Sequence, residues 1–265
     1  MRFDYTFSNS DISQFCKSTF DFNPVHNPEY MSAKGKRVIV PGMMLFSKVA
    51  TLLFGTVGTA LNTYKILINS IISANETVTL GFEDGPDNQK YLFAINRLDS
   101  FSNGSERSRV YLRNTTVEPP DVGNLVSLPV EQWQLDTFGK VIGCQNVILR
   151  DFLFGIAYAS HALFRRIEHP QNEVELEVHS YLDKTQNSSQ ISPFYQTLEI
   201  FLPSNPIPLK PQLSIDYKIH LERELVGKVY IAHVKCEQQG ALLYHSVYRL
   251  VAIPDRLILR MAKDC

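Results

Sequence analysis

The chain has 265 residues, of which 44% are hydrophobic and 20% are charged, an ordinary balance for a folded globular protein. Its formal net charge is −1 and its lysines and arginines are scattered, which excludes the basic face that nucleic-acid binding requires. The length suits one compact unit or two similar halves that share a core.

The N-terminal residues lack the basic segment, apolar core and cleavage site of a secretory signal, so we expect a cytoplasmic protein. The apolar run 40–61 is interrupted by Lys48, which leaves a stretch too short to cross a bilayer, and no membrane span is predicted. The cysteines show no paired spacing, which argues against a zinc site and a disulfide framework; they are Cys16, Cys144, Cys236 and Cys265.

In chain order, residues 2–7 alternate polar and aromatic side chains and predict a strand, and Ser10 is the expected N-cap of a helix over 11–20. Pro24 and Pro28 stop that helix, and 32–37 is expected to be a loop. Residues 40–61 are apolar nearly all round, which indicates a buried helix. Strand-like runs then predict an antiparallel meander: 63–72, 76–84, 90–99 and 108–116. A buried helix covered by a sheet is an α+β arrangement.

A connector at 117–124, rich in Pro and Gly, predicts a boundary between an N-terminal half, 1–118, and a C-terminal half, 119–265. The second half is expected to echo the first, with a strand within 126–142 that holds Trp133 and a long helix over 146–167. Further strands are predicted at 174–182, 194–202, 213–222, 228–237 and 241–253.

The motif Asp21-Phe22-Asn23-Pro24-Val25-His26 places a carboxylate and an imidazole on a turn braced by proline. Such a pair can orient one water, with one group removing its proton while the other delivers a proton to carbon. Asn23 is expected to form the turn rather than to take part in the chemistry. Alone, an Asp and a His near a helix end are commonly a cap and a surface residue.

Together with Val40-Pro41-Gly42-Met43 at the start of the apolar helix, this motif resembles the MaoC-like or (R)-specific enoyl-CoA hydratase family, over roughly residues 4–60. The resemblance implies a hotdog fold, a long helix wrapped by an antiparallel sheet, and the two-part layout makes a double hotdog the expected form. It implies Asp21 and His26 as the catalytic pair and the Gly42 amide as the contact for the thioester oxygen. A departure is Asn27-Pro28-Glu29 after the histidine, where family members usually have an acidic residue earlier.

The implied reaction is hydration of a 2-enoyl thioester to a (R)-3-hydroxyacyl thioester, or the reverse, on coenzyme A or acyl carrier protein. Both steps are proton transfers, so no cofactor and no metal are expected. Ser47 is a candidate substrate contact, although a helical serine more commonly donates its hydroxyl hydrogen bond to its own helix. Lys34, Lys36 and Arg37 are candidates for the carrier's phosphates, although such a run is more often solvated.

Two other functions stay open on the same fold. A hotdog thioesterase also directs water with an acidic residue, and a non-catalytic acyl-binding or partner subunit keeps the fold without turnover. The second half lacks the motif, so we expect it to complete a pseudo-dimer within one chain, with a homodimer also possible. The remaining histidines are interpreted as structural: His161, His169, His179, His220, His233 and His245.

Overall fold

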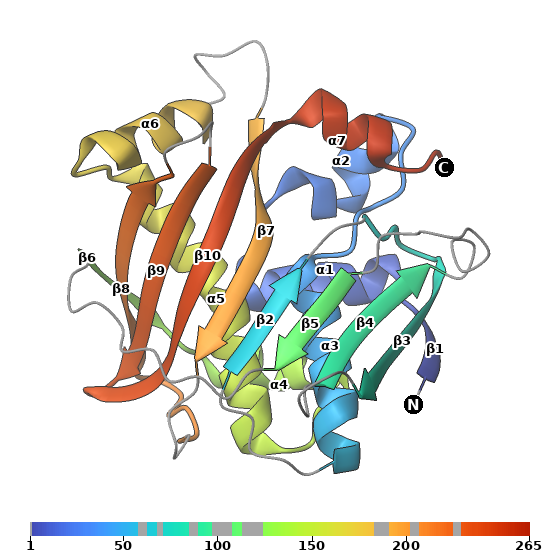
Figure 1. The fold of residues 1–265 in the computed structure, drawn as a ribbon, viewed down its shortest axis with the longest axis horizontal. Coiled ribbons are helices and arrows are strands. Elements are labelled where there is room, and N and C mark those ends of the chain that lie inside the picture. The colour runs from blue at the N-terminus through green and yellow to red at the C-terminus, as the bar shows by residue number, and fades with distance from the viewer. Residues whose placement is uncertain are drawn as a thin grey trace.

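The computed structural model of the chain forms one large sheet on one side of a group of helices (Figure 1). It describes residues 2–57, 63–67, 71–84, 90–96, 108–112, 124–182, 191–201, 207–224 and 229–265. The predicted boundary after residue 118 lies outside these residues, as do 58–61 of the predicted helix. Parts of five predicted strands also lie outside them: 68–70, 97–99, 113–116, 202 and 228. The position of the boundary therefore stays a prediction.

The first half begins with a strand and three helical segments that lead into a long helix and further strands. In chain order these are β1 (Arg2–Thr6), α1 (Asn9–Thr19), the 3₁₀ helix η1 (Pro24–His26), α2 (Pro28–Ala33), α3 (Gly42–Val57), β2 (Thr63–Leu67), β3 (Thr77–Asp84), β4 (Lys90–Asn96) and β5 (Ser108–Leu112). The second half has β6 (Asn124–Pro129), α4 (Gln132–Ile142), α5 (Val147–Glu168), α6 (Glu173–Leu182), β7 (Ile191–Phe201), β8 (Ser214–Arg223), β9 (Val229–Gln238), β10 (Ala241–Pro254) and α7 (Asp255–Met261).

The ten strands follow the order β1-β3-β4-β5-β2-β7-β10-β9-β8-β6. Read from one edge to the middle, the first half gives β1, β3, β4, β5 and β2. Read from the other edge to the middle, the second half gives β6, β8, β9, β10 and β7. In both halves the strands therefore follow the order first, third, fourth, fifth and second. The two second strands, β2 and β7, pair antiparallel, with Thr63 opposite Phe201 and Leu67 opposite Thr197. The order is therefore symmetric about this seam, which shows two copies of one topology in a single sheet.

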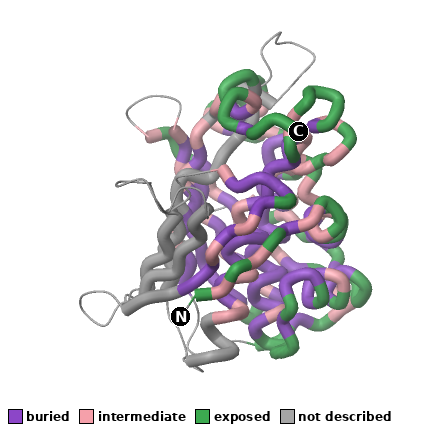
Figure 2. The backbone as a smooth tube through the Cα atoms, turned by 90° about the vertical axis from the view of Figure 1, so that its right-hand side faces the viewer, coloured by how far each residue is buried: buried purple, intermediate pink, exposed green. Residues whose placement is uncertain are grey.

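The long helices α3 and α5 lie behind this sheet (Figure 1). Their apolar side chains and the inward residues of the strands form one continuous core that extends from Phe7 to Ala262. In Figure 2 the buried stretches concentrate in these helices and in the strands that face them. α5 is long and apolar enough to cross a membrane by length and composition, but 72% of its most apolar window is buried inside the protein. It is a core helix.

The α+β prediction and the two long helices are confirmed, with α5 starting one residue after its predicted start. The meander prediction is partly wrong: β3, β4 and β5 pair in sequence, but β2 pairs with β5 and β7 rather than with β3. β1 takes the place next to β3 instead. This order lets β2 reach the seam.

Several predictions of local structure are wrong. Ser8, not Ser10, caps α1, because the Asp11 N–H donates to Ser8 Oγ at 3.0 Å while Ser8 N–H donates to Asp11 Oδ2 at 3.3 Å. The predicted strand over 126–142 ends at Pro129, and Trp133 lies in the helix α4, whose start is closed by a 2.8 Å bond from Glu131 N–H to Gln134 Oε1.

The run 174–182 is also helical rather than extended. Asn172 Oδ1 accepts the Glu175 N–H at 2.9 Å, which satisfies a donor of the first turn of α6. A buried ion pair of 2.6 Å between Arg166 of α5 and Glu175 then fixes α6 on α5. Val174 and Val178, four residues apart, share the packed side of this helix, whereas Leu176 between them is 58% exposed. The N-terminal Asn was the signal for a helix.

Candidate active site

The turn that carries the motif follows α1 directly. Phe20 takes a left-handed conformation with φ of 51°, and the Asp21 N–H donates to Cys16 O at 3.0 Å, which closes the helix. Asp21 Oδ1 accepts the Asn23 N–H at 3.2 Å. One carboxylate oxygen is therefore held by the turn, and the other, Oδ2, faces His26.

Asn23 and Pro24 shape the next step of the chain. Asn23 Oδ1 accepts the Val25 N–H at 3.3 Å, and Pro24 occupies the first turn of η1, where its missing N–H costs nothing. Asn27 then caps α2 through a 2.9 Å bond from the Tyr30 N–H to its Oδ1. These local bonds set the backbone path from Asp21 to His26 and on into α2, a helix that was expected to be a turn and loop.

His26 is oriented by a backbone carbonyl. Its Nδ1 lies 2.7 Å from Ile39 O, and because a carbonyl can only accept, Nδ1 carries the proton in this bond. The Ile39 N–H in turn donates to Val25 O at 3.0 Å. Since Ile39 also bridges to Ser73, the carbonyl that holds the imidazole is itself fixed on both sides.

Asp21 Oδ2 and His26 Nε2 lie 3.8 Å apart, too far for a direct hydrogen bond. The exposed fraction of the side chain is 15% for Asp21 and 10% for His26, so the pair is accessible but mostly shielded from solvent. In protonated His26 the Nε2 atom carries a hydrogen and is a donor, whereas the carboxylate oxygen is an acceptor. A water between them can accept from Nε2 and donate to Oδ2.

Gly42 begins α3, as the sequence predicts. Its N–H is in the first helical turn and has no acceptor within the helix, so it is a donor at the positive end of the helix dipole. Three extended residues span at most about 11 Å, so Gly42 stays within that distance of Ile39, whose carbonyl holds His26. The chain thus keeps this donor near the pair.

Ser47 lies on α3 and is 0% exposed. Its hydroxyl makes no hydrogen bond in the described part of the chain, while its own carbonyl accepts from the Thr51 hydroxyl at 2.8 Å. The back-bond expected for a helical serine is therefore absent. An unpaired buried hydroxyl is costly, so Ser47 stays a candidate substrate contact.

The three basic candidates lie in the loop after α2 and face the end of the chain. Lys36 Nζ pairs with Asp264 Oδ1 at 2.6 Å, and Arg37 Nη1 lies 3.7 Å from Glu76 Oε1. Lys34 Nζ lies 5.8 Å from the centre of the Tyr30 ring. Two of the three therefore have structural partners, and in the described part of the chain none of them forms an ion pair or hydrogen bond with Asp21 or His26.

An aromatic cluster from the second half surrounds the motif. The Phe20 ring packs against Tyr158 and His161 of α5 and Trp133 of α4, at centroid distances of 6.0, 5.2 and 6.4 Å. Burial, followed by the nearby Arg165, lowers the pKa of His161. No spacing in the sequence links His161 to the motif, because the contact depends on the packing of α5 against the turn.

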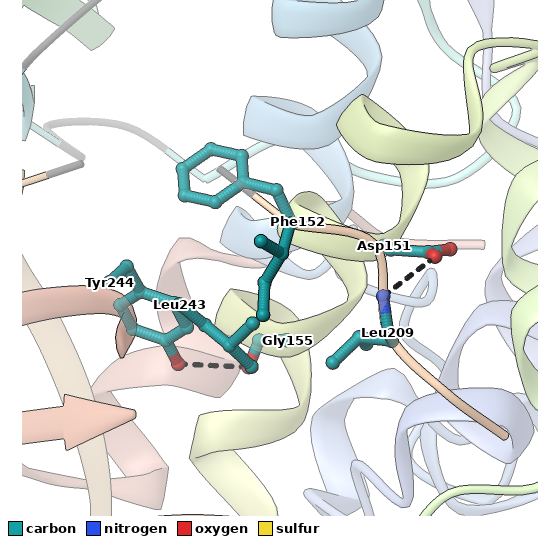
Figure 3. Close-up of a pocket in the computed structure, with 7 residues that line it drawn as sticks. Asp151, Phe152, Gly155, Leu209, Leu243 and Tyr244 are labelled. Atoms are coloured by element: carbon teal, nitrogen blue, oxygen red, sulfur yellow. Dashed lines mark hydrogen bonds between the residues drawn. The ribbon is translucent and has the colours of Figure 1, made fainter. Parts of the chain in front are cut away.

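A small pocket lies elsewhere, between α5, the segment 207–209 and β10 (Figure 3). Its carboxylate, Asp151, accepts the Leu209 N–H at 3.0 Å and pairs with Arg150, and burial raises the pKa of Asp151. Tyr244 OH donates to Gly155 O at 2.9 Å. With its polar groups paired and a volume of about 10 Å³, room for one water, the pocket is no acyl site.

The part of the chain that the structure describes contains no group of three or more His, Cys, Asp or Glu side chains placed to hold a metal ion. The prediction of a metal-free site concerns the whole chain and stays a prediction.

Comparisons with solved structures place this geometry on a known fold. A MaoC-like dehydratase from Phytophthora capsici has a TM-score of 0.56 at 10% identity, covering 94% of each chain. A conserved hypothetical protein of Mycobacterium tuberculosis with a double hotdog fold has a TM-score of 0.53 at 8% identity, covering 96% of each. A putative oleoyl thioesterase from Lactobacillus plantarum has a TM-score of 0.50 at 9% identity, covering 96% of each.

The chain has the double hotdog fold. Its symmetric strand order agrees with these structural neighbours over nearly the full length, and the expected fold is confirmed. The resemblance to MaoC-like proteins is shown at the level of the fold, with sequence identities near 10%. No model of a protein family matches the sequence, and no curated protein matches it.

Proposed function

We propose that the protein is a hydratase or dehydratase of acyl thioesters, converting a 2-enoyl thioester and a (R)-3-hydroxyacyl thioester into one another. The observation that carries the proposal is the facing pair of a carboxylate and an imidazole, with Asp21 Oδ2 and His26 Nε2 3.8 Å apart on a turn fixed by backbone bonds. A dehydratase and a thioesterase among the structural neighbours share this fold, so the reaction is inferred from the site rather than from the fold.

In hydration, a water held between the two groups attacks the β-carbon of the enoyl chain. Asp21 takes a proton from the water, and the His26 imidazolium gives its Nε2 proton to the α-carbon. The Ile39 carbonyl keeps the Nδ1 proton in place throughout, so only Nε2 exchanges protons with the substrate. After hydration the proton that Asp21 has gained returns to His26, which restores the starting state. Dehydration runs the same steps in reverse: neutral His26 removes the α-proton and protonated Asp21 gives its proton to the leaving hydroxyl.

The negative charge that develops on the thioester oxygen needs a donor. The Gly42 N–H, at the start of α3, supplies one together with the helix dipole, and the missing side chain leaves room for the thioester. Ser47, with its unpaired buried hydroxyl, is the second proposed contact of the substrate. The surrounding core excludes bulk water from the reacting carbon atoms.

The direct test is the loss of enoyl absorbance when purified protein is mixed with crotonyl-CoA or with a crotonyl group on acyl carrier protein. We expect Asp21→Asn and His26→Ala each to lower kcat/KM by at least about 100-fold, because each removes a proton-transfer group. The matched controls are Asp136→Asn, at an exposed position of α4, and His169→Ala, at an exposed position after α5; both should keep full activity.

Two outcomes contradict the proposal. Full turnover in both dyad variants would remove Asp21 and His26 from the chemistry. Release of free thiol from an acyl thioester, followed with a thiol reagent, with no change in the enoyl absorbance would identify a thioesterase that uses the same water for hydrolysis.

A further inference from the structure

The C-terminal helix α7 presents a mixed basic and apolar face to solvent. Arg256 and Arg260 are exposed, and Leu257 and Met261 between and beside them are 42% and 54% exposed. Residues at these spacings share one side of a helix. We call these four residues the α7 face.

The α7 face is rigidly held. On the opposite side of the helix Ile258 and Ala262 are 0% and 3% exposed and belong to the core. Neither Arg256 nor Arg260 forms an ion pair with any residue that the structure describes. Because the other side of α7 is packed into the core, its two unpaired guanidinium groups and two large apolar side chains stay exposed to solvent.

This helix is attached to the segment that follows the dyad. The Arg37 N–H donates to Lys263 O at 2.9 Å, the Cys265 N–H donates to Gly35 O at 3.1 Å, and Lys36 pairs with Asp264. Figure 1 shows α7 and α2 together at one end of the molecule. From His26 the chain reaches this loop through α2, whose six residues span about 9 Å.

The loop adds cations that the neighbouring carboxylates, Glu76 and Asp264, do not fully balance. Lys34 is exposed, and the Glu76 carboxylate is approached by two cations, Arg37 at 3.7 Å and Lys263 at 2.9 Å. The edge formed by the loop and the α7 face therefore carries surplus positive charge in a chain whose net charge is −1. A partner that binds here must be acidic.

The apolar half of the α7 face distinguishes a protein from a small anion. Arginine and methionine are enriched at protein interfaces, and adjacent exposed apolar side chains rimmed by charge mark such surfaces. Phosphate groups use cations and backbone N–H donors but gain nothing from Leu257 and Met261. We propose that the α7 face docks an acidic carrier domain that delivers the acyl thioester to Asp21 and His26 on a phosphopantetheine arm. The identity of the cargo rests on the proposed function; the acidic partner does not.

The test compares two crotonyl substrates, one on coenzyme A and one on acyl carrier protein. The double variant Arg256→Glu/Arg260→Glu reverses the charge, and Leu257→Ser/Met261→Ser removes the apolar surface. The control Lys140→Glu makes a single charge reversal on α4, at the opposite end of the molecule (Figure 1). We expect both double variants to lower kcat/KM for the carrier-protein substrate by about tenfold or more. Turnover of crotonyl-CoA should stay unchanged, and the control should change neither.

Unchanged turnover of both substrates in both double variants would overturn the proposal. An equal loss for both substrates would overturn it as well, because the surface would then serve the phosphates of coenzyme A or the fold itself. If the wild-type protein turns over neither substrate, the proposed function fails while docking is still decided by calorimetry with the pantetheinylated carrier protein. Binding that weakens with salt and is lost in the charge-reversed variant supports the α7 face; no binding to the wild-type protein excludes it.

Discussion

At the scale of single residues, Ser47 carries the clearest conflict between stability and function. Its hydroxyl is fully buried and makes no hydrogen bond within the described residues. A buried polar group without a partner costs about 1–3 kcal/mol, so a purely structural position would favour alanine. The serine is explained if a substrate group completes its hydrogen bond.

Replacing Ser47 with alanine should therefore raise the free energy of unfolding by about 1 kcal/mol while lowering kcat/KM for the crotonyl substrates. Urea unfolding and initial rates measure the two effects. Ser18→Ala is the matched control: its buried hydroxyl donates to Phe15 O at 2.8 Å, so its loss should destabilise the protein without that gain. A destabilised Ser47→Ala variant with full activity would make Ser47 an ordinary core residue.

His245 of β10 is a second buried residue with unpaired polar atoms. Its ring is 2% exposed, stacks on Phe201 at 5.3 Å and faces His233 at 6.4 Å, and among the described residues neither ring nitrogen has a hydrogen-bond partner. Burial, followed by the charges of His233 and Lys235, lowers the pKa of His245 to about 4. The folded protein therefore holds this imidazole neutral.

The sign of the resulting pH dependence follows from the two states. Between pH 6.5, the ordinary value, and about 4, the unfolded chain binds a proton at His245 that the folded chain does not, so stability falls as the pH falls. The loss reaches at most about 3 kcal/mol and levels off below pH 4. His245→Phe should match the wild type more closely at pH 8 than at pH 4.5, where it should be more stable; parallel stability curves over this range would contradict the shift.

At the scale of elements, the two halves differ at one place. α1 and α4 occupy equivalent positions after the first strand of each half, and both end in a left-handed residue, Phe20 with φ of 51° and Gly143 with φ of 71°. In the second half only residues 143–146 then lead to α5, whereas 20–41 in the first half hold the motif and α2. The second half lacks the whole segment that carries the proposed chemistry.

Residues 20–41 begin with Phe20 in a left-handed backbone conformation. A bulky residue in the left-handed region is strained, at a cost of about 1–2 kcal/mol, and glycine is the usual solution, as at Gly143. The ring contacts of Phe20 with Tyr158 and His161 offset this cost. The motif turn is therefore held to the second half by the residue directly before Asp21.

Local signals predicted the motif turn and the start of α3 well, because Pro24 and Gly42 act through their own backbone. They failed at Trp133 and at 174–182, where short apolar runs predicted strands but the chain forms helices. In the second case Val174 and Val178 pack inward while Leu176 between them is exposed. The aromatic contacts of His161 and the docking of the C-terminal residues on the loop after α2 depend on distant packing. No spacing in the sequence encodes either contact.

At the scale of the whole molecule, the duplication is visible in the strand order and almost invisible in the sequence, where it left only the tripeptide Leu-Phe-Gly in each long helix. Topology survives because any apolar side chain of suitable size can face the core. The halves are also interlocked beyond the seam of β2 and β7. Gln134 of α4 donates to Ser18 O of α1 at 3.0 Å in a buried position, and Lys36 bridges to Asp264 at the other end of the chain.

Halves that share one core and one sheet should unfold together. Cys16 lies in α1 of the first half and Cys236, 0% exposed, in β9 of the second, so the two thiols report on different halves. Burial raises the pKa of both thiols and keeps them unreactive in the folded state, while the exposed Cys265 should react throughout. In pulsed thiol labelling along a urea series, read by peptide mass spectrometry, we expect Cys16 and Cys236 to lose protection at one common midpoint. Separate midpoints would show that the seam between β2 and β7 joins two independently folding units.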